Sequence, residues 1–321
     1  MKKENESRRA FLKGAAAGAS AGVVAAFIPT ANAQSGNAAQ AAHDSPIASL
    51  RREGTMPMVD IGQFEIYYVD EGEGFPLVLI HGLAGDHRAW LPQIAAFKDR
   101  HRVIAFDNPG SGESSDVTGP ASTEDLARAT LSLMDRLDID RAHVIGRSMG
   151  GAIAQHMALL APDRVHSMIL AASFAKFDPV GTRVLSNMSE VLEWRDNWTD
   201  WARHATWAFF SPKFYNENPD AVANMQAIIG DEARSKISYI NLNKACLAHD
   251  TLDRLGEITC PTLIMAGAVD PVCSMTATRW MQDGLPQAET VIFQNSSHFF
   301  LIEEADKAMS AIADWLQRHT P

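Results

Sequence analysis

Cysteine is scarce in this chain of 321 residues, which contains only Cys246, Cys260 and Cys273. The number is odd, and no two of them stand in a Cys-x-x-Cys spacing. A disulfide framework or a cysteine-based metal site needs more cysteines in a regular pattern, so neither is expected. Buried thiols are the simplest interpretation, and a single disulfide between two of the three stays open.

The sequence also lacks the patterns by which proteins bind metals and nucleic acids. Its 11 histidines include no His-Glu-x-x-His motif and no cluster, so we expect no metal and no organic cofactor. The formal net charge is -11, and there is no basic stripe and no basic patch interleaved with aromatic residues. This charge distribution excludes nucleic acid as the expected partner.

A long apolar run is missing as well, and the N-terminus comes closest to one. Gly14–Ile28 is diluted by glycine and alanine, whereas a membrane span needs about 18 or more strongly apolar residues. It follows Ser7–Lys13, which resembles the twin-arginine export motif, and precedes the small-residue cleavage site Ala31-Asn32-Ala33. We expect the twin-arginine export machinery to recognise residues 1–33, which are then removed, leaving a periplasmic protein without a stable span. An uncleaved membrane anchor is the alternative.

The rest of the chain predicts an α/β domain behind a flexible leader, residues 34–56, which has no periodicity. Short β-branched runs alternate with helical patterns, which favours a mainly parallel, doubly wound sheet with helices on both faces. The expected strands are Glu65–Val69, Pro76–Ile80, Arg102–Phe106, His143–Ile145, Val165–Ala171, Cys260–Gly267 and Thr290–Phe293, and the clearest helix is Thr123–Leu137.

A serine stands at the centre of Gly-x-Ser-x-Gly directly after one of these strands. The octet Val144–Gly151 contains Gly146, Ser148 and Gly150, and a helical pattern follows it. The serine therefore lies on a corner between strand and helix, where the glycines make room and Ser148 holds a strained backbone with its hydroxyl lifted toward solvent. This is the geometry of a nucleophile elbow, although the motif alone would also fit an ordinary tight turn.

A serine hydroxyl needs a base, and an acid that orients the base, before it acts as a nucleophile at neutral pH. Asp270 and His298 each stand just beyond the carboxyl end of an expected strand. The order Ser, Asp, His therefore predicts Ser148 as the nucleophile, Asp270 as the acid and His298 as the base. Asp178 is the alternative acid.

Hydrolysis of a carbonyl compound also needs donors for the developing oxyanion. The backbone N–H of Met149 lies at the start of the helix after the elbow, where unpaired amides favour negative charge. The second donor is expected from the loop His81–Gly85, in which glycine lets the N–H of Leu83 turn inward.

Strand and helix stop alternating between residues 171 and 260, a stretch too long for a structureless loop. We expect a helical cap over residues 175–250, inserted into a core made of residues 57–174 and 251–321. Trp194, Trp198 and Trp201 recur at helical spacing and are predicted to share one face. That face either joins the cap to the core or lines an apolar pocket over Ser148.

Arg147 and Phe299 flank the expected nucleophile and base and are further pocket candidates. Arg147 either contacts a carboxylate or carbonyl of the substrate or points away and pairs with an acidic neighbour.

These features together resemble the α/β-hydrolase superfamily, in its branch of serine esterases, enol-lactonases and carbon–carbon hydrolases. The resemblance extends from residue 58 to the C-terminus and implies the α/β-hydrolase fold, the triad Ser148, Asp270 and His298, and the oxyanion donors Leu83 and Met149. A serine at position 148 separates the chain from relatives that attack through a carboxylate. The matching stretches are His81-Gly82, Asp107–Ser114, Gly146–Gly151, Pro261–Asp270 and Ser297-His298.

The chain departs from that resemblance at three positions. Carbon–carbon hydrolases usually carry Asn before the nucleophile and Trp after the histidine, where this chain has Arg147 and Phe299. Many relatives have Arg at the position of Asn108, to which we assign no function.

The expected function is therefore that of an exported serine hydrolase that cleaves a small carboxylic ester or lactone, with a hydrophobic substrate. A carbon–carbon hydrolase and a haloperoxidase-like perhydrolase are alternatives with related chemistry. A ligand-binding protein on a hydrolase scaffold is the alternative from another class.

Overall fold

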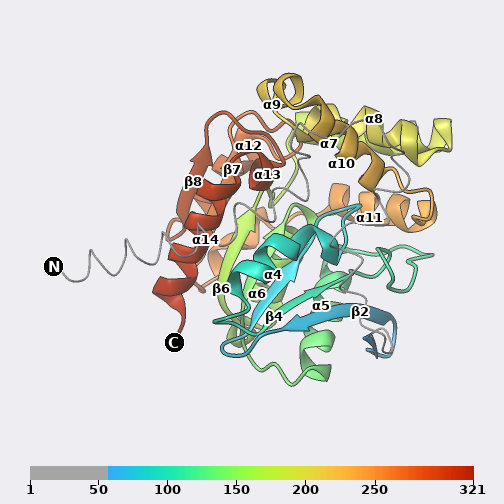
Figure 1. Ribbon diagram of the computed structural model, residues 1–321. Helices are drawn as coiled ribbons and strands as arrows, with labels where there is room; N and C mark the ends of the chain where they lie inside the picture. Colours follow the sequence, from blue (N-terminus) through green and yellow to red (C-terminus); the bar gives the residue numbers. More distant parts are fainter. Residues whose placement is uncertain (1–56) are drawn as a thin grey trace, which may run out of the picture.

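The computed structural model describes residues 57–321, so the predicted signal (residues 1–33) and leader (residues 34–56) lie outside the described residues. The described chain folds around an eight-stranded sheet in the order β1-β2-β4-β3-β5-β6-β7-β8 (Figure 1). The two pairs β1·β2 and β2·β4 are antiparallel and the others are parallel, which confirms the mainly parallel sheet. The strands are β1 (Met58–Asp60), β2 (Glu65–Glu71), β3 (Leu77–Ile80), β4 (Val103–Phe106), β5 (Ala142–Arg147), β6 (Val165–Ala171), β7 (Thr262–Gly267) and β8 (Glu289–Phe293).

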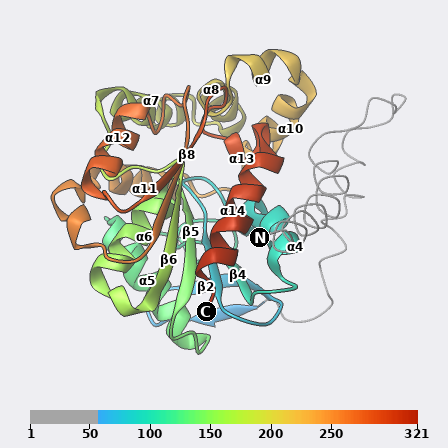
Figure 2. The same cartoon turned by 90° about the vertical axis from the view of Figure 1, so that its left-hand side faces the viewer.

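Helices cover both faces of the sheet because the central strands are apolar on both sides. In β3, Val78 and Ile80 pack into one core and Leu77 and Leu79 into the other, as the alternation of side chains along a strand requires. Helices α5, α6 and α12 contribute to the first core, and α4 and α14 to the second (Figure 2). These helices are α4 (Leu91–Phe97), α5 (Thr123–Arg136), α6 (Met149–Leu160), α12 (Met275–Gly284) and α14 (Ala305–His319), with the short α13 (Phe300–Glu303) and the 3-10 turns η2 (His87–Trp90), η3 (Pro162–Arg164) and η4 (Leu252–Glu257).

The start of α5 shows how local sequence sets a helix boundary. The Ser122 side chain accepts a hydrogen bond from the amide of Asp125, and the Asp125 carboxylate accepts one from the amide of Ser122. This reciprocal cap satisfies amides that have no partner inside the helix. Within residues 57–321, no helix has both the length and the apolar character needed to cross a membrane.

Five helices stand between β6 and β7, where the sequence predicted a helical insertion. They gather at one end of the sheet, above the loops that follow the parallel strands (Figures 1 and 2). We call them the helical insertion: α7 (Pro179–Arg195), α8 (Trp198–Phe209), α9 (Pro212–Glu217), α10 (Pro219–Ile229) and α11 (Lys236–Ala248).

The prediction of one shared tryptophan face was wrong. Helix α7 ends at Asp196, whose φ of 53° is left-handed, and Asn197 caps α8, so Trp194 stands on a different helix from Trp198 and Trp201. Trp194 is 79% exposed and lies beside the Arg195 guanidinium, so it is withdrawn as a pocket residue. Trp198 and Trp201 are buried and pack edge to face inside the insertion, with ring centroids 5.2 Å apart.

Two buried histidines make the fold sensitive to acid. His143 contacts the hydroxyl of Ser167, His249 contacts that of Thr123, and burial lowers the pKa of each imidazole to about 3. Between pH 6.5 and 3 the unfolded chain therefore binds protons that the folded chain does not. We expect the free energy of unfolding to fall in this window by up to ~1.4 kcal/mol per pH unit for each histidine.

Urea unfolding measured at pH 7, 6 and 5 checks this expectation. His143→Gln, which has no titrating side chain, should show a shallower fall than the wild type. An unchanged free energy of unfolding between pH 7 and 5 in the wild type would contradict it.

Candidate active site

Ser148 is the single residue between β5 and α6, and its backbone is strained. Its φ of 54° and ψ of -118° lie in a region that non-glycine residues rarely adopt, at a cost of about 1–3 kcal/mol. The flanking glycines are needed for space. A Cβ on Gly146 would overlap the Gly150 carbonyl, and one on Gly150 would overlap the carbonyl of Ile80. The corner therefore has the geometry predicted for a nucleophile elbow.

Neighbouring segments hold this conformation from both sides of the peptide. The Ser148 amide donates to the carbonyl of Ala171, the last residue of β6, at 2.9 Å. The Ser148 carbonyl accepts from the hydroxyl of Ser173 at 2.9 Å and from the amide of Gly151 at 2.9 Å. Because these bonds form only in this conformation, they offset the strain at the serine.

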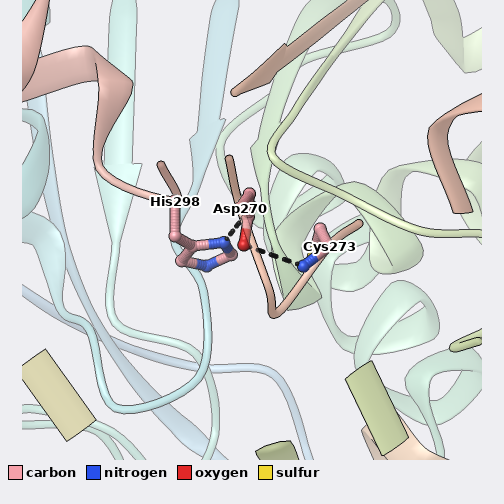
Figure 3. Close-up of side chains that lie close together, drawn as sticks. All are labelled: Asp270, Cys273 and His298. Carbon is pink, nitrogen blue, oxygen red and sulfur yellow. Dashed lines mark hydrogen bonds and ion pairs between the residues drawn. The ribbon is translucent and has the colours of Figure 1, made fainter. Parts of the chain in front are cut away.

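Asp270 and His298 meet beyond the ends of β7 and β8 (Figure 3). The Nδ1–H of His298 donates to Oδ2 of Asp270 at 2.8 Å, and both side chains are buried. The other carboxylate oxygen accepts from the amides of Val272 (2.7 Å) and Cys273 (3.0 Å). The carboxylate is thus fixed by three donors, and it holds the imidazole in the tautomer whose Nε2 can accept a proton.

The alternative acid, Asp178, has a different partner set. Its carboxylate caps the N-terminus of α7 by accepting from the Gly181 amide at 2.8 Å, and its second oxygen accepts from the Ser274 hydroxyl at 2.7 Å. The structure therefore pairs His298 with Asp270 and gives Asp178 a role in positioning the helical insertion.

Cys273 also lies in this site, although no motif in the sequence indicates it. All three cysteines are free and buried, so none forms the disulfide that had stayed open. The Cys273 thiol lies in hydrogen-bond contact with Ser148, and burial, followed by the nearby Asp270 charge, raises its pKa well above the ordinary value. The thiol therefore stays protonated and packs as a small neutral group beside the nucleophile.

Within the described part of the chain, residues 57–321, two groups of side chains have a spacing that could hold a metal ion. Asp270, Cys273 and His298 place ligand atoms within 4.8 Å of one another, as do Asp86, His87 and Asp107. In each group the carboxylates already accept hydrogen bonds from protein donors, and the thiol of the first group keeps its proton. These contacts engage the carboxylates of both groups in hydrogen bonds within the protein.

The loop after β3 brings its backbone against the serine. A Cβ on Gly82 would lie 2.9 Å from the Ser148 Cβ and 3.1 Å from the Arg147 carbonyl, so only glycine permits this approach. The Gly85 amide closes the turn onto the Gly82 carbonyl at 3.0 Å, and Ala84 takes a left-handed φ of 58°. Leu83 is thus carried within the turn beside the nucleophile. Met149, the other expected donor, is the first residue of α6, where helix amides have no partner in the preceding turn.

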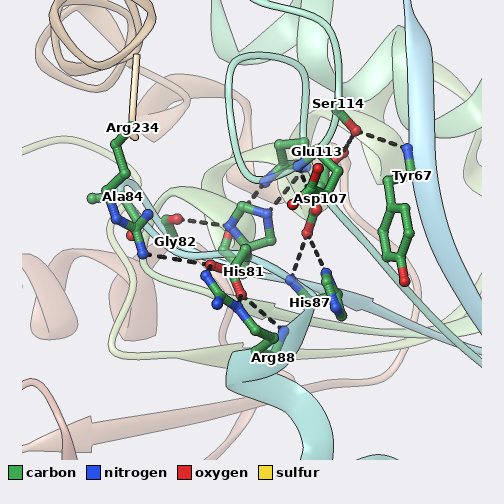
Figure 4. A network of polar contacts seen from close by, with 12 residues as sticks. Tyr67, His81, Gly82, Ala84, His87, Arg88, Asp107, Glu113, Ser114 and Arg234 are labelled. Atoms are coloured by element: carbon green, nitrogen blue, oxygen red, sulfur yellow. Dashed lines mark hydrogen bonds and ion pairs between the residues drawn. The ribbon is translucent and has the colours of Figure 1, made fainter. Parts of the chain in front are cut away.

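Asn108, to which the sequence assigned no role, bonds His81 at the start of this loop; Figure 4 shows His81 beside Gly82. Its amide N–H donates to Nε2 of His81 at 3.0 Å, and its side-chain amide donates to the His81 carbonyl at 3.1 Å. The other ring nitrogen of His81 bonds the Gly82 carbonyl at 2.8 Å, and burial lowers the pKa of the ring. A neutral His81 therefore links Asn108 to the turn that carries Leu83.

Arg147 and Phe299 lie next to each other beside the catalytic candidates. The Arg147 guanidinium stands 4.8 Å from the centre of the Phe299 ring. Its Nε is buried with no hydrogen-bond partner, and burial lowers the pKa of the side chain to about 10. Among the ion pairs of residues 57–321, none joins Arg147 to a carboxylate. The predicted acidic partner was therefore not found. Phe209, one of the aromatic residues that follow the tryptophans in the sequence, stacks on Phe299 at 4.8 Å and lies 5.7 Å from the His298 ring.

The helical insertion also bonds residues 297–299, which carry His298 and which we call the histidine loop. At the end of α8, the Ala208 carbonyl accepts from the Ser297 hydroxyl at 3.0 Å and the Phe209 carbonyl accepts from the Phe299 amide at 2.9 Å. The last carbonyls of a helix have no partner inside it, so they are free to take these donors. His298 is thus held between two residues that both bond α8.

Residues 76–305 match the family described by the alpha/beta hydrolase fold. The chain belongs to the α/β-hydrolase family. It is similar to 3-oxoadipate enol-lactonase 1 of Acinetobacter baylyi, with 30% identity over 243 residues, 75% of this chain and 88% of that protein. A protein of Azorhizobium caulinodans provisionally named carbamate hydrolase RutD is 29% identical over 76% of this chain and 92% of its own length. The crystal structure of the enol-lactonase from Burkholderia xenovorans LB400 has a TM-score of 0.71 at 25% identity and covers 81% of this chain and 100% of that one.

Gly82→Ala tests the close approach of the two loops. The added Cβ must push the loop away from Ser148, and a displacement of about 1 Å in such a site can lower a rate ~100-fold. We expect labelling of Ser148 by a fluorophosphonate to slow by about that factor, with little change in thermal stability. Gly119→Ala is the matched control, because its Cβ would meet no atom within 4 Å. Equal labelling rates in the two variants would show that the approach does not matter.

Proposed function

We propose that this α/β-hydrolase is a serine hydrolase that cleaves a carboxylic ester or lactone through an acyl-enzyme. The observation that carries the proposal is the His298–Asp270 hydrogen bond of 2.8 Å at the same end of the sheet as the strained Ser148 corner. A ligand-binding scaffold has no need for a buried imidazole oriented by a carboxylate that three donors fix.

The proposed reaction has two steps. Ser148 Oγ attacks the carbonyl carbon while Nε2 of His298 takes the hydroxyl proton, and the oxyanion accepts from the Leu83 and Met149 amides. His298 returns the proton to the departing alkoxide, which leaves as an alcohol or as the opened end of a lactone. Water then attacks the acyl-serine and loses a proton to His298, which passes that proton to Ser148 Oγ as the bond to the serine breaks and the acid is released. Asp270 stabilises the imidazolium in both steps.

The substrate proposed is partly apolar. Phe209 and Phe299 lie beside His298, and the helical insertion stands over the site as a cap. Aromatic rings at this position favour an apolar acyl or alcohol group. Export by residues 1–33 through the twin-arginine route remains a prediction from the sequence.

Arg147 adds the proposal that the substrate carries a carboxylate. A buried guanidinium whose Nε has no partner is costly unless a ligand supplies the missing acceptor. The guanidinium lies against Phe299, the residue after His298, which supports a substrate carboxylate on this side of the site. Of the relatives described above, the one named 3-oxoadipate enol-lactonase 1 agrees with an acidic acyl chain.

Ser148→Ala should abolish hydrolysis of nitrophenyl esters and labelling by a fluorophosphonate, because both require the serine oxygen. Circular dichroism and the melting temperature should stay close to those of the wild type, since Ser148 Oγ accounts for little of the packing. Ester hydrolysis at the wild-type rate by the variant would refute the proposed nucleophile. A wild type that is neither labelled nor active would favour a ligand-binding protein.

Arg147→Met should change substrate preference more than rate. We compare the nitrophenyl ester of butyrate with that of hemisuccinate, which adds one carboxylate. The wild type is expected to have the higher kcat/KM on the charged ester. In the variant, the ratio of the two kcat/KM values should fall about tenfold, which corresponds to the loss of one hydrogen bond to a charged group. Arg195→Met, which removes an exposed arginine that stacks on Trp194, is the control. An unchanged preference in the Arg147 variant would exclude this role.

A further inference from the structure

Arg234 reaches from the helical insertion into the loop that carries Leu83 (Figure 4). It stands between α10 and α11, and its side chain is only 12% exposed. Its Nη1–H donates to the Ala84 carbonyl at 2.8 Å, and its Nη2 lies 3.4 Å from Oδ2 of Asp86. One planar guanidinium therefore contacts two points of the same short loop.

The first contact fixes the peptide that follows Leu83 and Ala84. Ala84 holds a left-handed φ of 58°, a conformation that is strained for a residue with a Cβ. A donor on its carbonyl stabilises this orientation of the peptide plane. Because Leu83 is the adjacent residue, the direction of its N–H depends on the same turn.

The second contact reaches a carboxylate that organises the rest of the loop. Asp86 is buried and caps η2 by accepting from the amide of Arg88 at 3.0 Å. The Arg88 side chain donates to both carboxylate oxygens, at 2.9 and 2.7 Å. These contacts, with the charge of Arg234, hold the pKa of Asp86 well below its usual range, so the carboxylate stays ionised. Arg234, which belongs to the helical insertion, places a second positive charge beside this buried carboxylate.

The backbone of Arg234 is itself held in place. Nε1–H of Trp198 donates to the Arg234 carbonyl at 3.0 Å, and Trp198 is buried between Trp201 and Tyr239. The guanidinium is thus presented by a segment that is bonded to a buried aromatic cluster of the insertion. An anchored side chain of this kind can position a loop with little loss of conformational entropy.

We propose that Arg234 is a positioning residue for the oxyanion donor Leu83, so that this half of the oxyanion hole depends on the helical insertion. The proposal rests on the proposed serine hydrolase function. Arg234 does not touch the reacting atoms. It acts through the Ala84 carbonyl and Asp86, and its loss weakens the binding of the tetrahedral state more than the binding of the substrate.

The test compares Arg234→Gln and Arg234→Lys with the wild type in the full chain. Lys236→Gln is the matched control, because Lys236 is a cation of the same insertion whose hydrogen bonds go to Asp196 and not to the loop after β3. For each protein we measure kcat and KM on a nitrophenyl ester, the rate of fluorophosphonate labelling, and the inhibition constant of a phenylboronic acid. A boronate forms a tetrahedral adduct on the serine and so reports on the oxyanion site.

We expect kcat and boronate affinity to fall together by about tenfold in Arg234→Gln, less than the ~100-fold that follows complete loss of an oxyanion donor. KM should stay within about twofold, because substrate binding in the ground state makes little use of the oxyanion hole. Arg234→Lys should fall by about threefold, since an ammonium reaches one acceptor but does not reproduce the planar fork. Lys236→Gln should match the wild type.

Wild-type values in Arg234→Gln, a change in KM alone, or an equal loss in Lys236→Gln would overturn the proposal. If Arg234→Gln does not fold, Arg234→Lys decides: a joint fall in kcat and boronate affinity supports the proposal, and unchanged values refute it. If the wild type is labelled and active and both Arg234 variants have wild-type kcat and boronate affinity, only the role of Arg234 is refuted. A wild type that is neither labelled nor active removes the proposed function, and this inference with it.

Discussion

The backbone of Ser148 is the constraint on which the rest of the site depends. A serine with a φ of 54° persists only because its amide and carbonyl are bonded by β6 and the segment after it, and because glycines leave room on either side. The corner lies at the end of β5, in the middle of the sheet, where both neighbouring strands are parallel to it. Two apolar cores therefore hold the corner that sets the direction of the hydroxyl and starts the helix whose first amide is Met149.

Each loop that faces the serine is fixed from two directions. On the side of the sheet, Asp270 holds the histidine loop, and His81 and Asn108 hold the loop after β3. On the opposite side, the helical insertion contacts both loops. Carbonyls of α8 accept hydrogen bonds from the histidine loop, and the guanidinium of Arg234 donates to the loop after β3. The chemistry proposed for the site needs little reorganisation because the groups concerned are already oriented before a substrate arrives.

Local sequence determined what could be predicted. Strand–helix alternation gave the fold, and Gly-x-Ser-x-Gly with Asp270 and His298 gave the candidate residues, because their positions depend on strand ends that nearby residues define. The parts that were missed depend on contacts distant in the chain. Cys273 meets Ser148, and Arg234 meets Ala84, 150 residues away, without any motif. The tryptophan face failed for a local reason, since the left-handed Asp196 ends a helix that periodicity alone would have continued.

The bond between the end of α8 and the histidine loop has a consequence for how such proteins diverge. Substitutions can change the side chains of the insertion that face the site. The end of α8 must still present carbonyls to the Ser297 hydroxyl and to the Phe299 amide. A recombination event that exchanged the whole segment would therefore alter the residues packed beside His298 and the bonds that orient its loop at once. Gradual substitution on the outer surface, where Trp194 is exposed, meets no such restriction. The outer surface of the insertion is thus free to vary, whereas its inner face is constrained by the hydrogen bonds to the histidine loop.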